Sequence, residues 1–73
     1  MTPDQFKQAR QSLGLSAVEA ARVLRFGASS DQAARNAISR IETGVRDLDA
    51  ARAELLRAYL TGYRPDDWPE KTA

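Results

Sequence analysis

Six side chains with hydrogen-bonding groups recur at helical spacing between residues 32 and 43. At about 100° per residue, four of them form one row on a helix and two flank it. The row is Gln32, Asn36, Ser39 and Thr43, and the flanking residues are Arg35 and Arg40. Amides can bond bidentately to adenine, arginine to guanine, and hydroxyls to bases or phosphates. With no acid near its centre, this face has the chemistry needed to read base edges in the major groove of DNA.

A solvated helix surface whose arginines are merely exposed is the simpler interpretation of the same residues. Helices with a purely solubilising surface more often carry glutamate and lysine four residues apart. The opposite side of this segment is apolar, with Ala34, Ile38 and Ile41 in one stripe and Ala37 beside them. Glu42 lies close to that stripe, where we expect it to meet a neighbouring helix start or an arginine.

Capping and stop signals predict four helices that position this face. The strings "TPDQ" and "SAVE" have the form of capping boxes and predict helix starts at Thr2 and Ser16. The third helix is expected to start at Ser29 or Ser30, and the fourth after Asp47 or Asp49. A glycine is placed to end each helix, at Gly14, Gly27, Gly44 and Gly62. No stretch alternates with period two for long enough to predict a strand, so the chain is expected to be all-α.

The fourth helix carries more apolar residues than one buried face needs. Leu48, Ala51, Leu55 and Tyr59 repeat at helical spacing and are expected to cover the core. A second apolar strip suggests a partner, because aligned exposed apolar residues mark interaction surfaces. The expected dimer interface is Leu56, Leu60, Tyr63 and Trp68. In the alternative interpretation, the C-terminal tail covers this strip within one chain.

Composition limits the chemistry available to the chain. Its 73 residues predict one domain, with a folded region at 1–62 and an irregular tail at 63–73. Cysteine and histidine are both absent, which excludes disulfides and zinc sites with the usual ligands. There is no Gly-rich phosphate loop and no isolated acid pair among apolar residues, and the acids Asp66 and Asp67 are expected to be solvated. We therefore expect neither an enzyme nor a cofactor.

The sequence contains no signal peptide and no apolar run of membrane-spanning length, so a cytoplasmic protein is expected. Charge is distributed unevenly along it. Residues 7–46 carry seven basic and three acidic side chains, whereas residues 47–73 carry four basic and six acidic ones. A basic body with an acidic end favours a polyanionic partner, although ordinary solvated charge would give the same pattern.

The expected order of elements is a short capped helix, a turn and a polar-faced helix, with one amphipathic helix before them and one after. The strings "ARQSLGLSAVEAARVL" and "ISRIETG" resemble the scaffold and recognition helices of Cro/CI repressor-type domains, also called the XRE family. The tail string "GYRPDDWP" is similar to the tails of small regulators of this type. The resemblance covers about residues 3–61. It implies a compact four- to five-helix bundle of the phage-repressor DNA-binding-domain type with a helix-turn-helix.

The sequence departs from the family pattern in one place. Thirteen residues separate Leu24 from Ile38, which is roughly two helical turns more than the family spacing. The extra residues fall in "RFGASSDQAARNA". Either the turn is a long loop, or the recognition helix begins early, near Ser30, as a capping box at Ser29 and Gln32 favours. The insertion occupies the end that leads into the groove, so it affects which residues enter it.

The resemblance implies a role for each matching residue. Arg35, Asn36, Ser39 and Arg40 match the family's base-reading positions, and Thr43 and Arg46 match positions near the phosphate backbone. Gln32 lies in the insertion, and its inclusion as a base reader depends on the helical wheel alone. Ser16 is either a phosphate donor at the scaffold-helix start or only a cap.

The polar face and the resemblance together predict a sequence-specific regulator of double-stranded DNA, a repressor that controls its own operon. One recognition helix reads too few base pairs, so a homodimer on an inverted-repeat operator is expected. Regulators of this type occur in phage and mobile-element operons, including those beside anti-CRISPR genes. The alternative is an antitoxin-like or adaptor module that binds a protein through the same helices. Such an interface would need aromatic anchors on the polar face, and none is present there.

Overall fold

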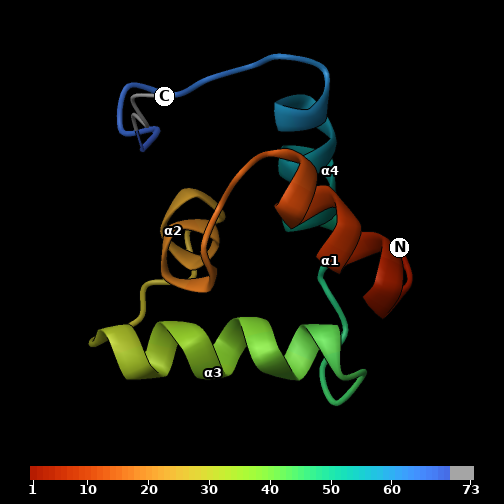
Figure 1. The fold of residues 1–73 in the computed structure, drawn as a ribbon, viewed down its shortest axis with the longest axis vertical. Helices are drawn as coiled ribbons and strands as arrows, with labels where there is room; N and C mark the ends of the chain where they lie inside the picture. The colour runs from red at the N-terminus through yellow and green to blue at the C-terminus, as the bar shows by residue number, and fades with distance from the viewer. Residues whose placement is uncertain (70–73) are drawn as a thin grey trace.

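The computed structural model describes residues 1–69, and these form four helices and no strand (Figure 1). The helices are α1 (Pro3–Ser12), α2 (Ala17–Val23), α3 (Asp31–Glu42) and α4 (Ala50–Leu60). α3 runs along one side of the molecule, and both α1 and α2 pack against it. The predicted all-α class is confirmed. Residues 70–73 of the expected tail lie outside the described residues.

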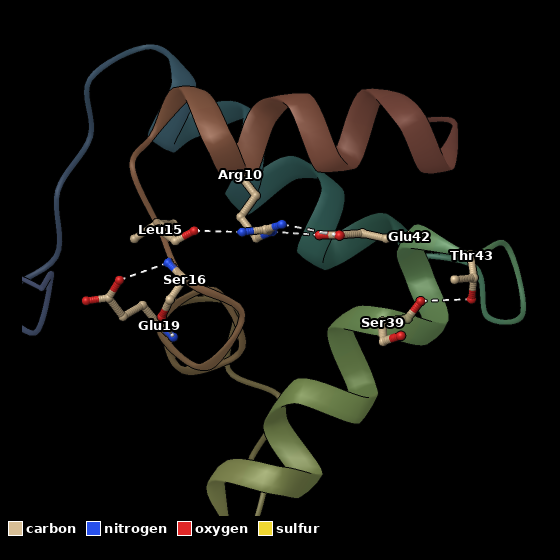
Figure 2. Close-up of polar contacts among 7 residues, drawn as sticks. All are labelled: Arg10, Leu15, Ser16, Glu19, Ser39, Glu42 and Thr43. Carbon is tan, nitrogen blue, oxygen red and sulfur yellow. Dashed lines mark hydrogen bonds and ion pairs between the residues drawn. The ribbon is translucent and has the colours of Figure 1, made fainter.

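The first two helices begin with the predicted capping boxes. The hydroxyl of Thr2 accepts the N–H of Gln5, and the Gln5 side chain accepts the N–H of Thr2. Ser16 and Glu19 form the same reciprocal pair at the start of α2 (Figure 2). Each box satisfies two backbone donors that a helix start otherwise leaves without partners.

The insertion between α2 and α3 is part loop and part helix. Ser30 caps α3 by accepting the N–H of Ala33 at 3.1 Å, so the helix begins at Asp31. This confirms the early helix start near Ser30, and it makes Ser30 rather than Ser29 the cap. Asp49 is the corresponding cap of α4.

The end of α2 differs from the prediction, which placed it at Gly27. Arg25 takes the left-handed conformation with φ of 64°, and the N–H of Phe26 donates to the carbonyl of Ala21 at 3.1 Å. That is the closing bond of a Schellman motif, in which glycine is the usual left-handed residue. The guanidinium of Arg52 explains the earlier end, because it donates to the carbonyls of Leu24 and Arg25 at 2.9 and 2.8 Å. A tertiary contact therefore caps α2.

Buried side chains from all four helices form one apolar core. It comprises Phe6, Ala9, Leu15, Ala20, Ala21, Val23, Leu24, Ala34, Ile38, Ile41, Leu56 and Tyr59. Tyr59 has no exposed surface, and its hydroxyl donates to the carbonyl of Val23 at 2.6 Å. This bond joins α4 to the end of α2 inside the core, and burial raises the pKa of the Tyr59 hydroxyl.

The buried face of α4 is not the one expected. Ala53, Leu56 and Tyr59 are buried, Leu48 and Leu55 are only partly buried, and Ala51 is exposed. The prediction was wrong for Ala51 and for Leu56, which belongs to the core. α4 is apolar on two sides, so periodicity did not identify which side faces inward. Tyr59 is buried as predicted, and its hydrogen bond to the Val23 carbonyl joins α4 to α2 in the observed rotation.

The tail packs back onto the helices through aromatic and ionic contacts. Trp68 meets the ring of Tyr59 edge to face, with 5.0 Å between centroids, and Arg64 lies 4.3 Å over the Trp68 ring. Asp67, expected to be solvated, forms a two-point ion pair with Arg25, whose Nη2 lies 3.0 Å from Oδ1. The hydrogen bond from Arg25 lowers the pKa of Asp67. The tail therefore contacts α4 and the end of α2 within one chain.

Candidate nucleic-acid interface

The outward face of α3 carries all the side chains predicted to meet bases. Gln32, Arg35, Asn36, Ser39 and Arg40 are exposed, while Ala34, Ile38 and Ile41 are buried on the opposite side. The predicted division of this helix is confirmed. The helix that carries this face is 12 residues long, or roughly 18 Å at about 1.5 Å per residue, enough to follow several base pairs along a groove.

Of the two acids of α3, Asp31 is exposed in the first turn, whereas Glu42 at the other end is directed into the fold. Glu42 pairs with Arg10 of α1, with 2.6 Å from Nε to Oε2 and 3.3 Å from Nη2 to Oε1 (Figure 2). The side chains are only 18% and 14% exposed, and Arg10 also donates to the carbonyl of Leu15 at 2.9 Å. The ion pair confirms the expected partner type for Glu42. It neutralises the carboxylate inside the fold, so the surface of α3 stays basic.

Three side chains at the start of the face form a hydrogen-bonded chain. Nη2 of Arg35 lies 3.4 Å from Oε1 of Gln32, and Nε2 of Gln32 lies 3.0 Å from Oδ1 of Asn36. Pairs of this kind, three and four residues apart, stabilise a helix by about 0.2–0.5 kcal/mol each. This series of hydrogen bonds begins at the guanidinium of Arg35 and ends at Asn36, whose amide nitrogen donates to no residue among 1–69.

Ser39 and Arg40 hold donors that the fold leaves unused. Neither side chain makes a hydrogen bond or ion pair with another residue in the described part of the chain. Guanidinium and hydroxyl donors in this condition are available to a ligand at the surface. The middle of the face can therefore donate to acceptor atoms such as guanine O6 and N7.

Thr43 is less suited to its predicted role at a phosphate. It is the C-cap of α3, and its hydroxyl donates to the carbonyl of Ser39 at 2.8 Å (Figure 2). A phosphate oxygen needs a donor, and this hydroxyl proton is already used. Thr43 completes the helix end instead.

Ser16 also has a local role. Its hydroxyl accepts the N–H of Glu19 at 3.2 Å, and the Glu19 carboxylate accepts the N–H of Ser16 at 2.9 Å. The carboxylate already neutralises the positive end of α2 and would repel a phosphate. Of the two roles predicted for Ser16, capping is the one that these contacts favour.

The guanidinium of Arg46 stacks over the ring of Phe26 in a cation–π contact that the sequence did not indicate. The Arg46 guanidinium is 5.1 Å from the centroid of Phe26, and that of Arg52 is 4.5 Å from the same ring. Arg52 donates to Asp49 and to the end of α2, and its hydrogen bond lowers the pKa of Asp49. Arg46 donates from its side chain to no residue in 1–69, so its in-plane donors remain free. Phe26 and Arg46 are twenty residues apart in the sequence, and no short-range pattern connects them.

The four residues expected at a dimer interface are not brought together as one exposed strip. Leu56 is 2% exposed and lies in the core, and Trp68 is partly buried against Tyr59. Leu60 and Tyr63 are 45% and 55% exposed, with the Tyr63 ring stacked 5.9 Å from that of Tyr59. Only Leu60 and Tyr63 remain as an apolar surface next to the tail.

Other kinds of site have little support in the described residues. Residues 1–69 bring together no group of three His, Cys, Asp or Glu side chains that could hold a metal ion. Within the same range, no helix is both long enough and apolar enough to cross a membrane. Comparisons with protein-family models, curated proteins and solved structures found no match to this chain.

Proposed function

We propose that the protein is a sequence-specific regulator that binds double-stranded DNA, with α2 and α3 as a helix-turn-helix and α3 as the recognition helix. The observation that carries the proposal is the outward face of α3, on which amides, a hydroxyl and two arginines are exposed without an acid among them. These are the groups that distinguish base pairs in the major groove. By the resemblance of the sequence, the regulated operon is its own, in a phage or mobile element.

The packing of α2 against α3 supports this proposal. In a helix-turn-helix, the first helix holds the second at the angle that lets its outer face enter the groove. The ion pair between Glu42 and Arg10 supports it further, because it fixes the end of α3 to α1 and removes a negative charge from the DNA side. Arg46, held over Phe26, supplies a phosphate contact beyond the end of α3.

Binding to DNA is tested with random duplexes and a matched pair of arginine variants. The wild type is expected to enrich a defined sequence, with affinity that falls steeply as salt rises. Arg40→Ala should weaken binding to that sequence by ~1–3 kcal/mol. Arg57→Ala removes the same charge from the exposed side of α4, where Arg57 pairs with Glu54, and should have little effect. Equal losses in both variants would show non-specific attraction and would contradict base reading by α3.

A homodimer is the expected form on DNA, because two recognition helices are needed to read an inverted repeat. The exposed residues Leu60 and Tyr63 are the proposed contact between the two protomers. Leu56 is no longer included in this contact, because its side chain is buried in the core. Sedimentation at micromolar concentration should give a dimer for the wild type and a monomer for Leu60→Glu. A wild type that stays monomeric both off DNA and on the full sequence that it selects would remove this part of the proposal.

A further inference from the structure

The amide of Gln32 differs from that of Asn36 in how the protein holds it. Both ends of the Gln32 amide are engaged, since its oxygen accepts from Arg35 at 3.4 Å and its nitrogen donates to Asn36 at 3.0 Å. Asn36 is held at one end only, through its oxygen. Its amide keeps one acceptor lone pair and two N–H donors for another molecule.

The donor and acceptor order of the hydrogen bonds from Arg35 to Gln32 and from Gln32 to Asn36 fixes which way each amide is turned. The oxygen and nitrogen of a side-chain amide are nearly alike in shape, so a flipped amide is excluded only by its hydrogen-bond partners. Arg35 can only donate, and it therefore requires the oxygen of Gln32 on its side. The nitrogen of Gln32 then faces Asn36 and requires the oxygen of Asn36 in turn.

We propose that Gln32 is a positioning residue, which together with Arg35 orients the Asn36 amide so that Asn36 reads one adenine. An adenine presents an acceptor, N7, and a donor, the N6 amino group, in the major groove. The remaining oxygen lone pair and nitrogen donors of Asn36 complement this pair of groups. This assignment depends on the proposed DNA binding by α3, and it changes the role predicted for Gln32 from base reader to support.

The proposal predicts that two different residues control the same base pair. In the sequence selected by the wild type, one A·T pair should be preferred over G·C by about 5- to 150-fold, the range for one bidentate contact. Asn36→Ala should abolish that preference. Gln32→Ala should reduce it at the same pair and leave preferences at the other pairs unchanged, because Asn36 is still present but free to flip.

A variant that reverses the direction of the hydrogen bond between residue 32 and Asn36 gives a sharper result. In Gln32→Glu the side chain can only accept, so Asn36 must turn its nitrogen toward residue 32. The preference for A·T at that pair should then be lost, in addition to a uniform loss of affinity from the added negative charge. Gln8→Ala is the matched control, because it removes an exposed glutamine from α1, away from the α3 face, and should leave this pair unaffected.

The outcomes separate the inference from the function on which it depends. If Gln32→Ala and Asn36→Ala erase preferences at different base pairs, Gln32 reads its own base and the positioning role is refuted. Unchanged discrimination in Gln32→Ala refutes it as well. If the wild type selects no sequence, the proposed function itself fails. The free protein gives an independent test by NMR. The side-chain amide signals of Asn36 should shift in Gln32→Ala and stay unchanged in Gln8→Ala. An unshifted signal in Gln32→Ala would contradict the hydrogen bond between Gln32 and Asn36.

Discussion

Removal of the Glu42 carboxylate tests whether the ion pair with Arg10 holds α3 against α1. In Glu42→Ala, Arg10 loses its contacts at 2.6 and 3.3 Å and keeps only the carbonyl of Leu15. Its side chain is 18% exposed, so water restores part of the lost interaction but not all of it. Breaking a fully buried pair costs ~3–5 kcal/mol, and breaking an exposed one costs ~0.2–1 kcal/mol.

The partial burial places the expected cost between these limits, at about 2–3 kcal/mol. A domain of 73 residues has a total unfolding free energy of roughly 4–11 kcal/mol, so this is a large fraction. The melting temperature should fall by roughly 10–20 °C, since each kcal/mol corresponds to about 4–8 °C at this size. Urea unfolding followed by circular dichroism measures the difference directly, and an unchanged m-value keeps the comparison valid.

Glu54→Ala is the matched control, because Glu54 pairs with Arg57 at 2.5 Å while both side chains are 57–73% exposed. That variant should lose at most about 0.5 kcal/mol. The double variant Arg10→Met with Glu42→Leu should be more stable than Glu42→Ala, because it leaves no unpaired charge in the interior. If Glu42→Ala costs no more than Glu54→Ala, the ion pair does not hold α3 and the reasoning from its burial is wrong.

Three further predictions concern the end of α2, the tail and the buried tyrosine. Arg25→Gly should be about 1 kcal/mol more stable than Arg25→Ala in urea unfolding, because both remove the guanidinium but only glycine relieves the positive φ; equal stabilities would contradict strain at this residue. The fluorescence of Trp68, the single tryptophan, should stay constant down to about pH 5 and shift to the red as the pH falls through and below the ordinary carboxyl pKa of 3.8. The pairing with Arg25 lowers the pKa of Asp67. The ion pair is therefore present above pH 3.8 and is lost as the carboxylate takes up a proton. Asp67→Asn should show the shifted spectrum at neutral pH, and a spectrum identical to that of the wild type would refute the ion pair as the tail's anchor. Tyr59→Phe should lose about 1–3 kcal/mol in urea unfolding, since the carbonyl of Val23 then stays buried without its donor; a loss below 0.5 kcal/mol, as for a roughly neutral surface change, would show that the bond contributes little.

Helix starts were predictable from the sequence because their causes are local. The hydroxyl and amide that cap α1 lie three residues apart, at Thr2 and Gln5, and the same holds for Ser16 and Glu19. The two faces of α3 were predictable for a similar reason, since Ile38 and Ile41 give its buried side a clear period.

The features that sequence reasoning missed depend on contacts between distant residues. α2 ends at Val23, short of Gly27, and Arg52 donates to the carbonyl of Arg25, twenty-seven residues away. α4 buries Leu56 and exposes Ala51, the reverse of what its periodicity favoured, because packing against the other helices selects between its two apolar sides. Residue spacing also indicated which side chains line the α3 surface, but their hydrogen bonds decide which donors remain free: Thr43 was expected to donate to a phosphate and donates to Ser39 instead.

The two ends of α3 are attached to the rest of the molecule unequally, and this has a consequence for its dynamics. At the C-terminal end, Ile38 and Ile41 are buried and Glu42 is bound to Arg10, whereas Ala34 is the single buried residue nearer the start. Local opening should therefore require less free energy in the first turn, and backbone amides there should exchange hydrogen with solvent faster than those near Ile41. A ligand that meets the start of α3 has to order this turn, and the entropy lost in doing so lowers its affinity. The affinity for a ligand at this face therefore depends partly on the fraction of free molecules in which the first turn of α3 is already helical.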